Sequence, residues 1–526
     1  MPGWLGWPLL LAAAPLRIAC WRRQERLGWD YAHGVLFWLI AFSFLSAVHP
    51  IAPLGAALLL GLTGVVEGWL FRRLARRLPL GVAGALALAA AAWLQREWFL
   101  IGAGGVPWAT WAWPLADSPL LRLGAALGES GLILLVAAFA GGVVSGFRRA
   151  HRDPCWIACA ALLIFGLVAP RAAAPVEGAL PCLAVQGNIR VKEKAQAHLD
   201  PPAFFLRQLG VTERALEAGA APQLIVWAET MWPFPVAAPS DAEAAGADAL
   251  LLRQYWPGWG NDDSPLSEVI AAPRRIARRA LAHAPGDALL VTGAHFYRPI
   301  PVDAPPEQLS PRSSESVVFD RDGALLAHLP KSELVPFGER LPFGGRLPFA
   351  RALTDAIQSA SGLRPDFARP PGDGPLRLDG LPALGFATCW ENVFEGVFRR
   401  QAHAGAQAFL VLSNEDWYGD DSREMTQMVA ISRLRAVETG RAILRVTNTG
   451  RTVLIGADGS VTEGPPPGVP EAWEVALPWV AGATRTPFLA FGWLLLPLAA
   501  ALGAVLALAP VKKSRFSSVD HPGGEG

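Results

Sequence analysis

Long apolar runs dominate the first 171 residues of the chain. Short clusters of arginine are almost the only polar interruptions there. A helix needs about 17 to 25 apolar residues to cross a bilayer, and a secretory signal peptide would supply only one such run. We therefore predict that this region forms a multi-pass helical membrane domain, with one further helix near the C-terminus. The predicted spans are residues 4–20, 34–51, 53–71, 80–97, 120–145, 155–170 and 488–510.

Basic residues mark one side of the predicted membrane. Clusters at Arg22, Arg72, Arg148 and Lys512 share a side if every predicted span crosses. An excess of lysine and arginine identifies the cytoplasmic side. We therefore expect the long segment between the sixth and seventh spans to lie outside the cytoplasm. The predicted division is a helical membrane domain at 1–171, an extracytoplasmic domain at 172–487, a final span at 488–510 and a cytoplasmic tail at 511–526.

The pattern of polar and apolar positions changes in the segment 172–487. Short apolar runs typical of strands alternate there with longer stretches typical of amphipathic helices. Asp-Gly pairs at 322–323 and 458–459 indicate hairpin turns. This alternation predicts a layered α/β domain. The expected strands are 182–186, 223–227, 288–292, 316–320, 408–412 and 442–446, and the expected helices are 202–218, 266–283, 393–403 and 424–439.

The composition supports a membrane protein and excludes several other classes. Hydrophobic residues make up 52% of the chain and charged residues 17%, whereas soluble domains average roughly 25% charged residues. A formal net charge of +1 provides no field to attract nucleic acid, so we expect no nucleic-acid partner. Five cysteines, an odd and low number, rule out a disulfide framework. No cluster of histidine, cysteine or carboxylate has metal-ligand spacing in the sequence, so we expect no metal and no other cofactor.

One cysteine stands in a reactive setting. Cys389 follows the apolar run 382–387, and Glu391 comes just after it. A turn from a strand into a helix leaves backbone N–H groups unpaired, and these can stabilise a thiolate and an oxyanion. The other cysteines lie in apolar runs, where cysteine is typically a small core residue. Glu229 and Lys331 also follow short apolar runs. The ends of three predicted strands therefore carry a carboxylate, an ammonium and a thiol, and this combination indicates acyl-transfer chemistry.

Several segments in a fixed order carry a resemblance to a known family. They are 185–188 (VQGN), 225–229 (IVWAE), 331–339 (KSELVPFGE), 389–391 (CWE), 413–419 (SNEDWYG), and 433–438 (RLRAVE) with 445–450 (RVTNTG). With Glu229, Lys331 and Cys389 in this order, the outer segment resembles the carbon-nitrogen hydrolase (nitrilase) superfamily. Because membrane spans lie on both sides of it, the chain is similar to the apolipoprotein N-acyltransferase family over most of its length.

The resemblance implies a fold and a mechanism. The fold would be an αββα sandwich on the outer face of a bacterial inner membrane. Glu229 would be the general base, Cys389 the nucleophile that becomes a thioester, and Lys331 the cation that stabilises the oxyanion. A phospholipid would donate the acyl chain, and the N-terminal amine of a diacylated prolipoprotein would accept it. The supporting residues would be Glu339, Trp390 and Glu391.

Further residues are predicted to contact the lipid substrates. Trp98 and Trp108 lie in an aromatic stretch between two predicted spans. That stretch is either an interfacial belt of aromatic residues or a wall of the active site. Asn414 and Trp417 lie in one of the matching segments, where they either shape the pocket or are structural. A long insertion without periodicity, 238–264, contains further tryptophans that are candidates for sealing the thioester from water.

Some positions depart from the pattern of the family. Ala228 stands where proline usually precedes the glutamate, and Trp390 stands where tyrosine usually follows the nucleophile. Ala195 lies near the position of an expected tryptophan, and Met428 replaces a usual histidine. None of these positions belongs to the triad. They bear on lipid recognition and on the preference for a donor.

Other functions remain open from the sequence. A membrane-tethered amidase or hydrolase would use the same triad, and a catalytically inactive scaffold or transporter-like protein belongs to another class. A transporter is expected to carry charged residues within its spans, and mainly Glu67 and Glu129 fall there. Along one predicted helix, Arg433, Arg435 and Glu438 are expected to form internal salt bridges rather than to bind a ligand.

Overall fold

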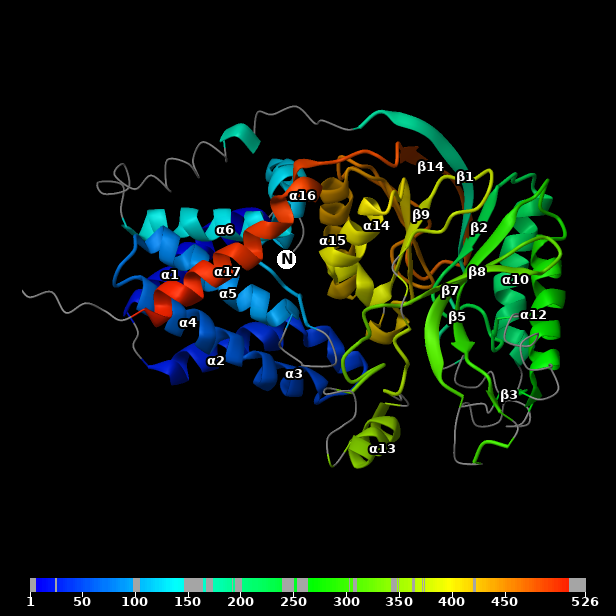
Figure 1. Ribbon diagram of the computed structural model, residues 1–526, viewed down its shortest axis with the longest axis horizontal. Helices are drawn as coiled ribbons and strands as arrows, with labels where there is room; N and C mark the ends of the chain where they lie inside the picture. The colour runs from blue at the N-terminus through cyan, green and yellow to red at the C-terminus, as the bar shows by residue number, and fades with distance from the viewer. Residues whose placement is uncertain are drawn as a thin grey trace, which may run out of the picture.

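The computed structural model contains a helix bundle joined to an α/β domain (Figure 1). It describes the chain except for residues 1–5, 24–25, 98–104, 146–163, 167–173, 192, 194–200, 239–249, 253–263, 302, 306–309, 342–347, 349, 362–364, 371, 373, 420–421 and 510–526. The predicted span at 155–170, apart from residues 164–166, and most of the predicted insertion at 238–264 therefore lie outside the described residues.

Helices occupy the other predicted spans. The bundle consists of α1 (Gly6–Arg23), α2 (Leu27–Ala41), η1 (Ser43–Ala47), α3 (Ala52–Leu60), α4 (Leu62–Leu74), α5 (Leu80–Glu97), α6 (Gly124–Ser145), α16 (Pro487–Ala490), η8 (Gly492–Leu494) and α17 (Leu495–Leu508). By length and composition, the helical stretches Ala52–Leu74 and Pro119–Ser145 can cross a membrane, and Leu80–Arg96 and Gly492–Leu508 are shorter apolar helices. Crossing by all the predicted spans stays a prediction.

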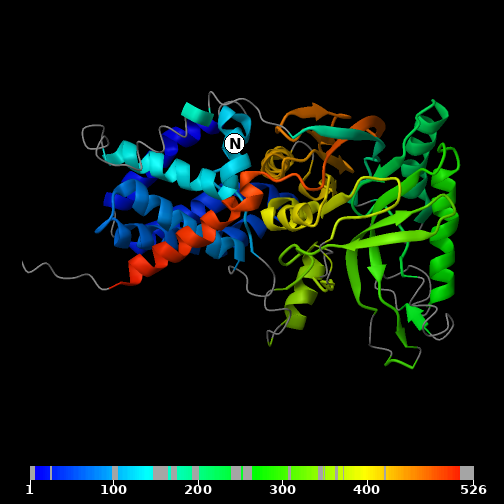
Figure 2. The same cartoon turned by 45° about the horizontal axis from the view of Figure 1, so that its top comes forward.

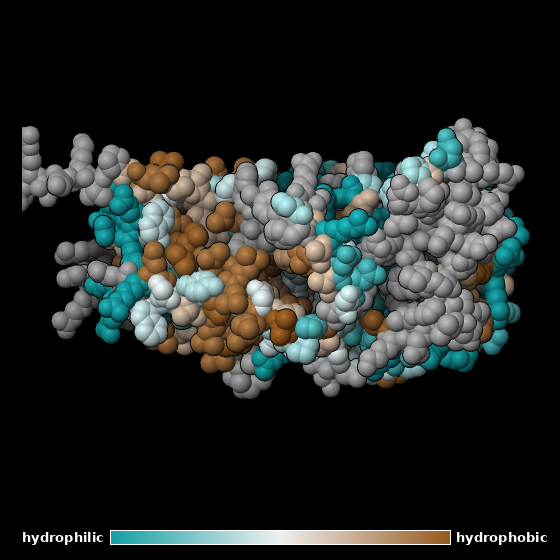
Figure 3. Space-filling model, turned by 90° about the horizontal axis from the view of Figure 1, so that it is seen from below, coloured by the Kyte–Doolittle hydropathy of each residue, from teal (hydrophilic) through white to brown (hydrophobic). Residues whose placement is uncertain are grey.

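The bundle exposes an apolar surface. Side chains such as Leu36, Ile40 and Leu54 of α2 and α3, and Leu498 and Val505 of α17, are each about half exposed or more. Figure 3 shows hydrophobic residues gathered over the bundle, between a hydrophilic end and the α/β domain. An apolar area of this extent indicates a surface that contacts something other than water.

Arginines close the hydrophilic end of the bundle. Arg73 Nε donates a hydrogen bond to the Ala507 carbonyl at 2.9 Å, and Arg77 donates to the carbonyls of Leu506 and Ala509 at 3.0 and 2.7 Å. Two of these carbonyls belong to the last turn of α17 and the third to the residue that caps it, where the helix supplies no further N–H donors. The C-terminal ends of α4 and α17 therefore lie together at this end.

The α/β domain contains two main sheets. The first has the order β14-β1-β2-β5-β7-β8, and the second has the order β13-β12-β11-β10-β9. Strands β1, β2 and β5 are mutually parallel, as are β9, β10 and β11. The strands are β1 (Val176–Gln186), β2 (Leu224–Trp227), β5 (Leu289–Tyr297), β7 (Arg312–Phe319), β8 (Leu325–Pro330), β9 (Leu384–Thr388), β10 (Ala408–Ser413), β11 (Ile443–Thr447), β12 (Val453–Ile455), β13 (Val461–Glu463) and β14 (Glu471–Val480).

Alternation along β10 shows how the layers pack. Leu410 and Leu412 belong to the core shared with the first sheet, whereas Phe409 and Val411 belong to the core shared with α14, α15 and the bundle. Successive side chains of a strand point to opposite faces, so the second sheet is covered on both sides. The outer layers are α10 (Pro201–Glu217) and α12 (Leu266–Leu281) on one side, and α14 (Glu395–His403) and α15 (Arg423–Thr439) on the other. The predicted layered α/β fold is confirmed.

Ion pairs join α15 to the bundle. Figure 1 and Figure 2 both show α14 and α15 between the second sheet and the bundle helices. Arg435 pairs with Glu129 of α6 and, at 3.1 Å, with Glu438 on its own helix. Arg433 pairs with Asp117 of η2 (Trp113–Asp117). The pair of Arg435 with Glu438 is the internal salt bridge expected for this helix, whereas the pairs with Glu129 and Asp117 cross between the domains, which was not expected.

Some elements differ from those predicted. The helix expected at 393–403 is preceded by a 3-10 turn, η6 (Cys389–Val393). The expected strands at 288–292 and 316–320 overlap β5 and β7, which are longer. Strand β14, which pairs antiparallel with β1 over ten positions from Val176 to Gln186, was not expected. The further elements are β3 (Leu250–Leu252), β4 (Ser264–Pro265), β6 (Ile300–Pro301), η3 (Pro119–Leu123), α13 (Ala350–Ser361) and η7 (Asp416–Tyr418).

Candidate active site

The structure brings Glu229 and Lys331 together, although they follow different strands. Glu229 comes two residues after β2, and Lys331 comes directly after β8. The Lys331 ammonium lies 3.3 Å from Glu229 Oε1 and 2.8 Å from Glu339 Oε1. Its side chain is fully buried. Because a buried ammonium is strongly unfavourable without partners, the two carboxylates account for its place in the interior.

Cys389 lies on a turn that directs its side chain toward the same interior. Strand β9 ends at Thr388, and Cys389 has a φ of +50°, in the left-handed region. A residue other than glycine adopts this conformation at a cost, and such strain persists where the surrounding structure enforces it. The charges of Lys331, Glu229 and Glu339 all act on the thiol. The three residues of the predicted triad therefore converge on one site.

Glu391 links the turn of Cys389 to the segment of Lys331. Its Oε2 accepts a hydrogen bond from the Thr388 backbone N–H at 2.8 Å. Its Oε1 accepts from the Ser332 N–H and hydroxyl at 2.6 and 2.8 Å. Glu391 therefore acts as a hydrogen-bond acceptor for two backbone segments, and burial raises its pKa.

The electrostatics of the site leave a neutral thiol beside a charged lysine. Burial raises the pKa of Cys389 above its ordinary value, and the Glu229 carboxylate raises it further, while Lys331 opposes them. Burial disfavours the Lys331 ammonium, but the carboxylates of Glu339 and Glu229 outweigh it and raise the pKa of Lys331. A base is therefore needed to activate the thiol, and the Glu229 carboxylate lies in the same interior.

Both carboxylates that pair with Lys331 are held from a second direction. Glu339 Oε2 accepts from the Val335 backbone N–H at 2.9 Å. Glu229 Oε2 accepts from the Asn414 backbone N–H at 3.2 Å, and the Asn414 side chain in turn accepts from Asn448 at 2.9 Å. Asn414 was predicted to bind substrate, and the structure shows that its backbone orients Glu229. Its contact with a lipid stays a prediction.

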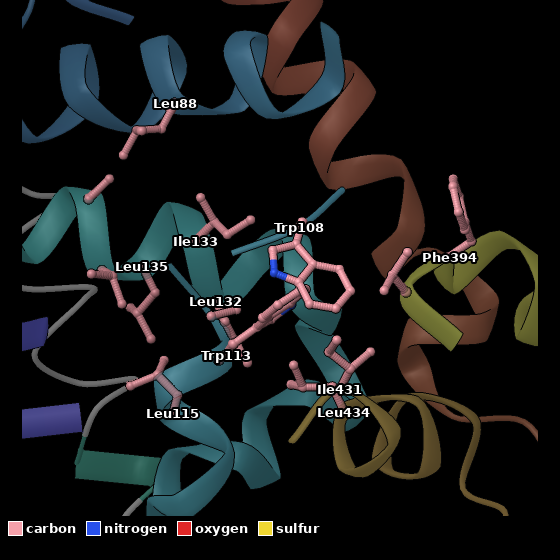
Figure 4. Close-up of a cluster of buried hydrophobic side chains, with 14 of the residues drawn as sticks. Leu88, Trp108, Trp113, Leu115, Leu132, Ile133, Leu135, Phe394, Ile431 and Leu434 are labelled. Atoms are coloured by element: carbon pink, nitrogen blue, oxygen red, sulfur yellow. The ribbon is translucent and has the colours of Figure 1, made fainter. Parts of the chain in front are cut away.

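The bundle contributes aromatic side chains beside the site. The Trp108 ring stacks on Trp390 with centroids 5.5 Å apart, and Trp113 meets Trp108 edge-on at 5.1 Å. Gln95 of α5 donates to the Trp108 carbonyl at 3.1 Å and so fixes this loop. Figure 4 shows Trp108 among the side chains of α6, of α15 and of Phe394.

The remaining predicted residues have varied positions. Trp98 and Ala195 lie outside the described residues, and Trp417 is half-buried on η7. Ala228 is fully buried directly before Glu229. The Met428 carbonyl accepts a hydrogen bond from Asn392 at 3.0 Å, so Met428 lies behind the turn of Cys389. In the part of the chain that the structure describes, no group of three or more His, Cys, Asp or Glu side chains can hold a metal ion.

Two residues near the nucleophile were not predicted individually. Burial raises the pKa of Tyr418 well above its ordinary value, and the charges of Cys389 and Glu424 raise it further. Tyr418 lies in the matching segment 413–419, which was the available signal in the sequence. Glu424, in the first turn of α15, carried no signal beyond an acidic side chain at a helix start.

An open cavity of about 510 Å³ lies between the bundle and the α/β domain. It is lined by Leu39, Ile40, Ser43, Phe44, Ser46, Ala47, Tyr418, Ser422 and Arg423. The Tyr418 ring meets Phe44 of η1 edge-on at 5.0 Å. One wall of the cavity therefore comes from helices with exposed apolar faces, and the other comes from the segment that contains Tyr418.

Comparison with known proteins gives two kinds of similarity. The carbon-nitrogen hydrolase family model matches residues 184–471. The apolipoprotein N-acyltransferase of Azotobacter vinelandii is 28% identical over 491 residues, which cover 87% of this chain and 82% of the relative. That of Pseudomonas putida is 28% identical over 410 residues, which cover 75% of this chain and 68% of the relative. That of Ralstonia nicotianae is 27% identical over 449 residues, which cover 83% of this chain and 74% of the relative.

Solved structures are also similar to part of this chain. An amidase from Nesterenkonia sp. has 18% identity and a TM-score of 0.35, covering 61% of this chain and 96% of that chain. A carbon-nitrogen hydrolase from Helicobacter pylori has 14% identity and a TM-score of 0.35, covering 57% of this chain and 89% of that chain.

Proposed function

The chain belongs to the carbon-nitrogen hydrolase family, and from this premise we propose that it acts as an apolipoprotein N-acyltransferase. It transfers an acyl chain from a phospholipid to the N-terminal amine of a diacylated lipoprotein. The similarity to bacterial enzymes of this name over most of the chain supports the activity. The buried Lys331, held between Glu229 and Glu339 beside Cys389, is the observation that carries the mechanism.

In the first step, Glu229 removes the proton from the Cys389 thiol. The thiolate attacks the ester carbonyl of the phospholipid, and the negative charge that develops on the oxygen is stabilised by the Lys331 ammonium. Collapse of this intermediate breaks the ester C–O bond and leaves an acyl thioester on Cys389. The departing lysophospholipid oxygen takes the proton from Glu229.

In the second step, the lipoprotein amine attacks the thioester. A C–N bond forms, the C–S bond breaks, and Lys331 stabilises the same oxyanion position. Water must be kept from the thioester between the two steps, because hydrolysis would waste the acyl chain. The stacked Trp108 and Trp390 and the buried aromatic cluster around them provide an apolar wall for this purpose.

The proposed location is a bacterial inner membrane, crossed several times by the chain, with the α/β domain on the periplasmic side. Its proposed boundaries are 1–171, 172–487, 488–510 and 511–526. The apolar surface of the bundle and the arginines at the end away from the α/β domain support this orientation. Both substrates are then lipids of the outer leaflet, and the site lies next to the outer end of the bundle.

Mass spectrometry of lipoprotein N-termini tests the proposed function. A bacterium depleted of its own N-acyltransferase is expected to accumulate diacylated lipoproteins, and this chain is expected to restore the triacylated form. Cys389→Ala is expected to fail, whereas Cys20→Ala, which changes an exposed cysteine of α1, is expected to succeed. Release of free fatty acid with no change in the lipoproteins would instead identify a hydrolase.

A further inference from the structure

Glu424 is a buried carboxyl group with no hydrogen-bond partner. It lies in the first turn of α15, where its backbone N–H donates to the side chain of Ser422 at 3.2 Å. The side chain is 0% exposed, and neither carboxyl oxygen has a partner among the described residues. Burial of an unpaired carboxyl is strongly unfavourable. Groups of this kind occur where a ligand or a reaction uses them.

The other acidic side chains of the site differ from Glu424. Both oxygens of Glu229, Glu339 and Glu391 accept hydrogen bonds or pair with Lys331. Among the buried carboxylates that the structure describes, Glu424 has both oxygens unpaired. The two unpaired oxygens of Glu424 can therefore accept hydrogen bonds from an N–H group of a bound substrate.

Glu424 lies close to the nucleophile but on a different element from Glu229. Burial and Glu229 are the main causes that raise the pKa of Cys389, and the charge of Glu424 raises it further, by more than that of Glu339 does. Tyr418 is also under the influence of Glu424. Glu424 belongs to α15, which covers the second sheet, whereas Glu229 follows a strand of the first. Two carboxyl groups from separate layers thus act electrostatically on the thiol.

The open cavity lies beside the start of α15, the helix that carries Glu424. Ser422 and Arg423, which directly precede Glu424, line the cavity together with Tyr418. The opposite wall is formed by α2 and η1, whose exposed apolar residues belong to the bundle. A lipid-anchored acceptor that occupies this cavity would contact Tyr418 and Arg423, and Arg423 directly precedes Glu424 in the chain.

We propose that Glu424 binds the ammonium group of the acceptor lipoprotein and removes one proton from it, so that the free amine can attack the thioester on Cys389. This inference rests on the proposed function and assigns to Glu424 a catalytic role in the second step. The acceptor nitrogen gives one proton to Glu424 and a second, through Glu229, to the sulfur as the C–S bond breaks. The third proton stays on the amide nitrogen, and Glu424 afterwards releases its proton to water.

The acidity of Glu424 suits this role. Burial raises its pKa to about 8, and the α-amine of a polypeptide has a pKa of about 8. Proton transfer between groups of similar pKa is fast in both directions. Approach of the cationic amine would favour the charged carboxylate. The titratable groups on which its charge acts are Cys389 of η6 and Tyr418 of η7, and Arg423 directly precedes it in the chain.

A two-stage assay on the full-length enzyme tests the proposal. The enzyme is first loaded from dipalmitoyl phosphatidylethanolamine, and the thioester is then chased with a diacylglyceryl-cysteine peptide or with hydroxylamine, which is uncharged at neutral pH. Intact-protein mass spectrometry follows the acyl group. Glu424→Gln is expected to load like the wild type but to slow the peptide chase about 100-fold at pH 7. The difference between the peptide-chase rates of the wild type and Glu424→Gln is expected to become smaller as the pH rises above the pKa of the amine, because the amine is then already deprotonated.

The hydroxylamine chase separates catalysis from folding. Because hydroxylamine needs no deprotonation, Glu424→Gln is expected to react with it at the wild-type rate, and the ratio of the two chase rates is independent of the folded fraction. Glu177→Gln, on the exposed part of β1, is the matched control and is expected to behave like the wild type. Equal slowing of loading and both chases by Glu424→Gln, or an unchanged peptide chase, would overturn the role of Glu424. Failure of the wild type to acylate the peptide would overturn the proposed function itself.

Discussion

The rings of Trp108 and Trp390 lie nearly parallel, 6° apart in plane and 5.5 Å apart between centroids. Trp108 comes from the loop between α5 and η2, and Trp390 directly follows Cys389. The residue next to the nucleophile is therefore held by a side chain of the bundle. Any shift of the α/β domain against the bundle would move the turn that positions the thiol.

Replacement of Trp108 tests this coupling. Trp108→Ala is expected to lower the free energy of unfolding by about 3 to 5 kcal/mol, because it removes a large side chain from a packed interior. It is also expected to slow thioester formation. Trp108→Phe keeps an aromatic ring against Trp390, so we expect it to retain more of the stability and more of the rate of thioester formation. Thermal unfolding and acyl-enzyme formation measure the two effects. Trp29→Ala, at an exposed position of α2, is the control, and an equal loss there would argue against the coupling.

Replacement of Lys331 tests the proposed oxyanion site. Lys331→Met removes the cation between Glu229 and Glu339, and it is expected to reduce the rate of thioester formation by about 10²- to 10³-fold. The two carboxylates would then be buried without a cation, so we also expect a loss of about 3 to 5 kcal/mol in the free energy of unfolding. Glu339→Gln in the Lys331→Met background is expected to recover part of this stability without recovering activity. Undiminished thioester formation in Lys331→Met would contradict the assignment.

Local patterns in the sequence predicted the parts of the site that depend on local structure. Glu229, Lys331 and Cys389 each follow a short apolar run, and a buried strand needs such a run. Parallel strands of one sheet bring their carboxyl ends to the same edge, which explains how β9 and β10 place Cys389 near Asn414. The resemblance supplied the order of the segments, and the structure supplies the distances between Lys331 and the two carboxylates.

Tertiary contacts account for what the sequence did not predict. A glutamate in the first turn of a helix is ordinary, because the helix dipole favours it there. Nothing local indicates that Glu424 is fully buried, since that depends on how the bundle and the second sheet enclose the first turn of α15. Strand β14 was missed for a related reason. Its exposed edge carries polar residues such as Glu474, so its pattern lacks a continuous apolar run.

Replacement of Glu391 tests how the turn of Cys389 is connected to Lys331. Glu391→Gln keeps the volume but replaces one acceptor oxygen with a donor, so one of the N–H groups of Thr388 and Ser332 loses its partner. An unsatisfied buried N–H costs about 1 to 3 kcal/mol, and we expect that decrease in the free energy of unfolding. Thioester formation is expected to slow, with little change in the concentration of donor needed for half the maximal rate. A change in donor affinity alone would assign Glu391 to lipid binding.

The pH dependence of Cys389 alkylation gives a test with an unambiguous sign. Burial and the charge of Glu229 raise the pKa of the thiol, so the rate of reaction with iodoacetamide is expected to increase only at a pH above the ordinary range for cysteine. Glu229→Gln removes a negative charge while Lys331 stays, so the pKa of Cys389 is expected to fall and alkylation at pH 8 to become faster. The same substitution removes the general base, so thioester formation from phospholipid is expected to become slower.

Mass mapping distinguishes Cys389 from the exposed Cys20, whose rate of alkylation serves as the internal control. If Glu229 is only a structural partner of Lys331, its replacement would leave the alkylation profile unmoved, and the opposite responses of the two reactions would not appear.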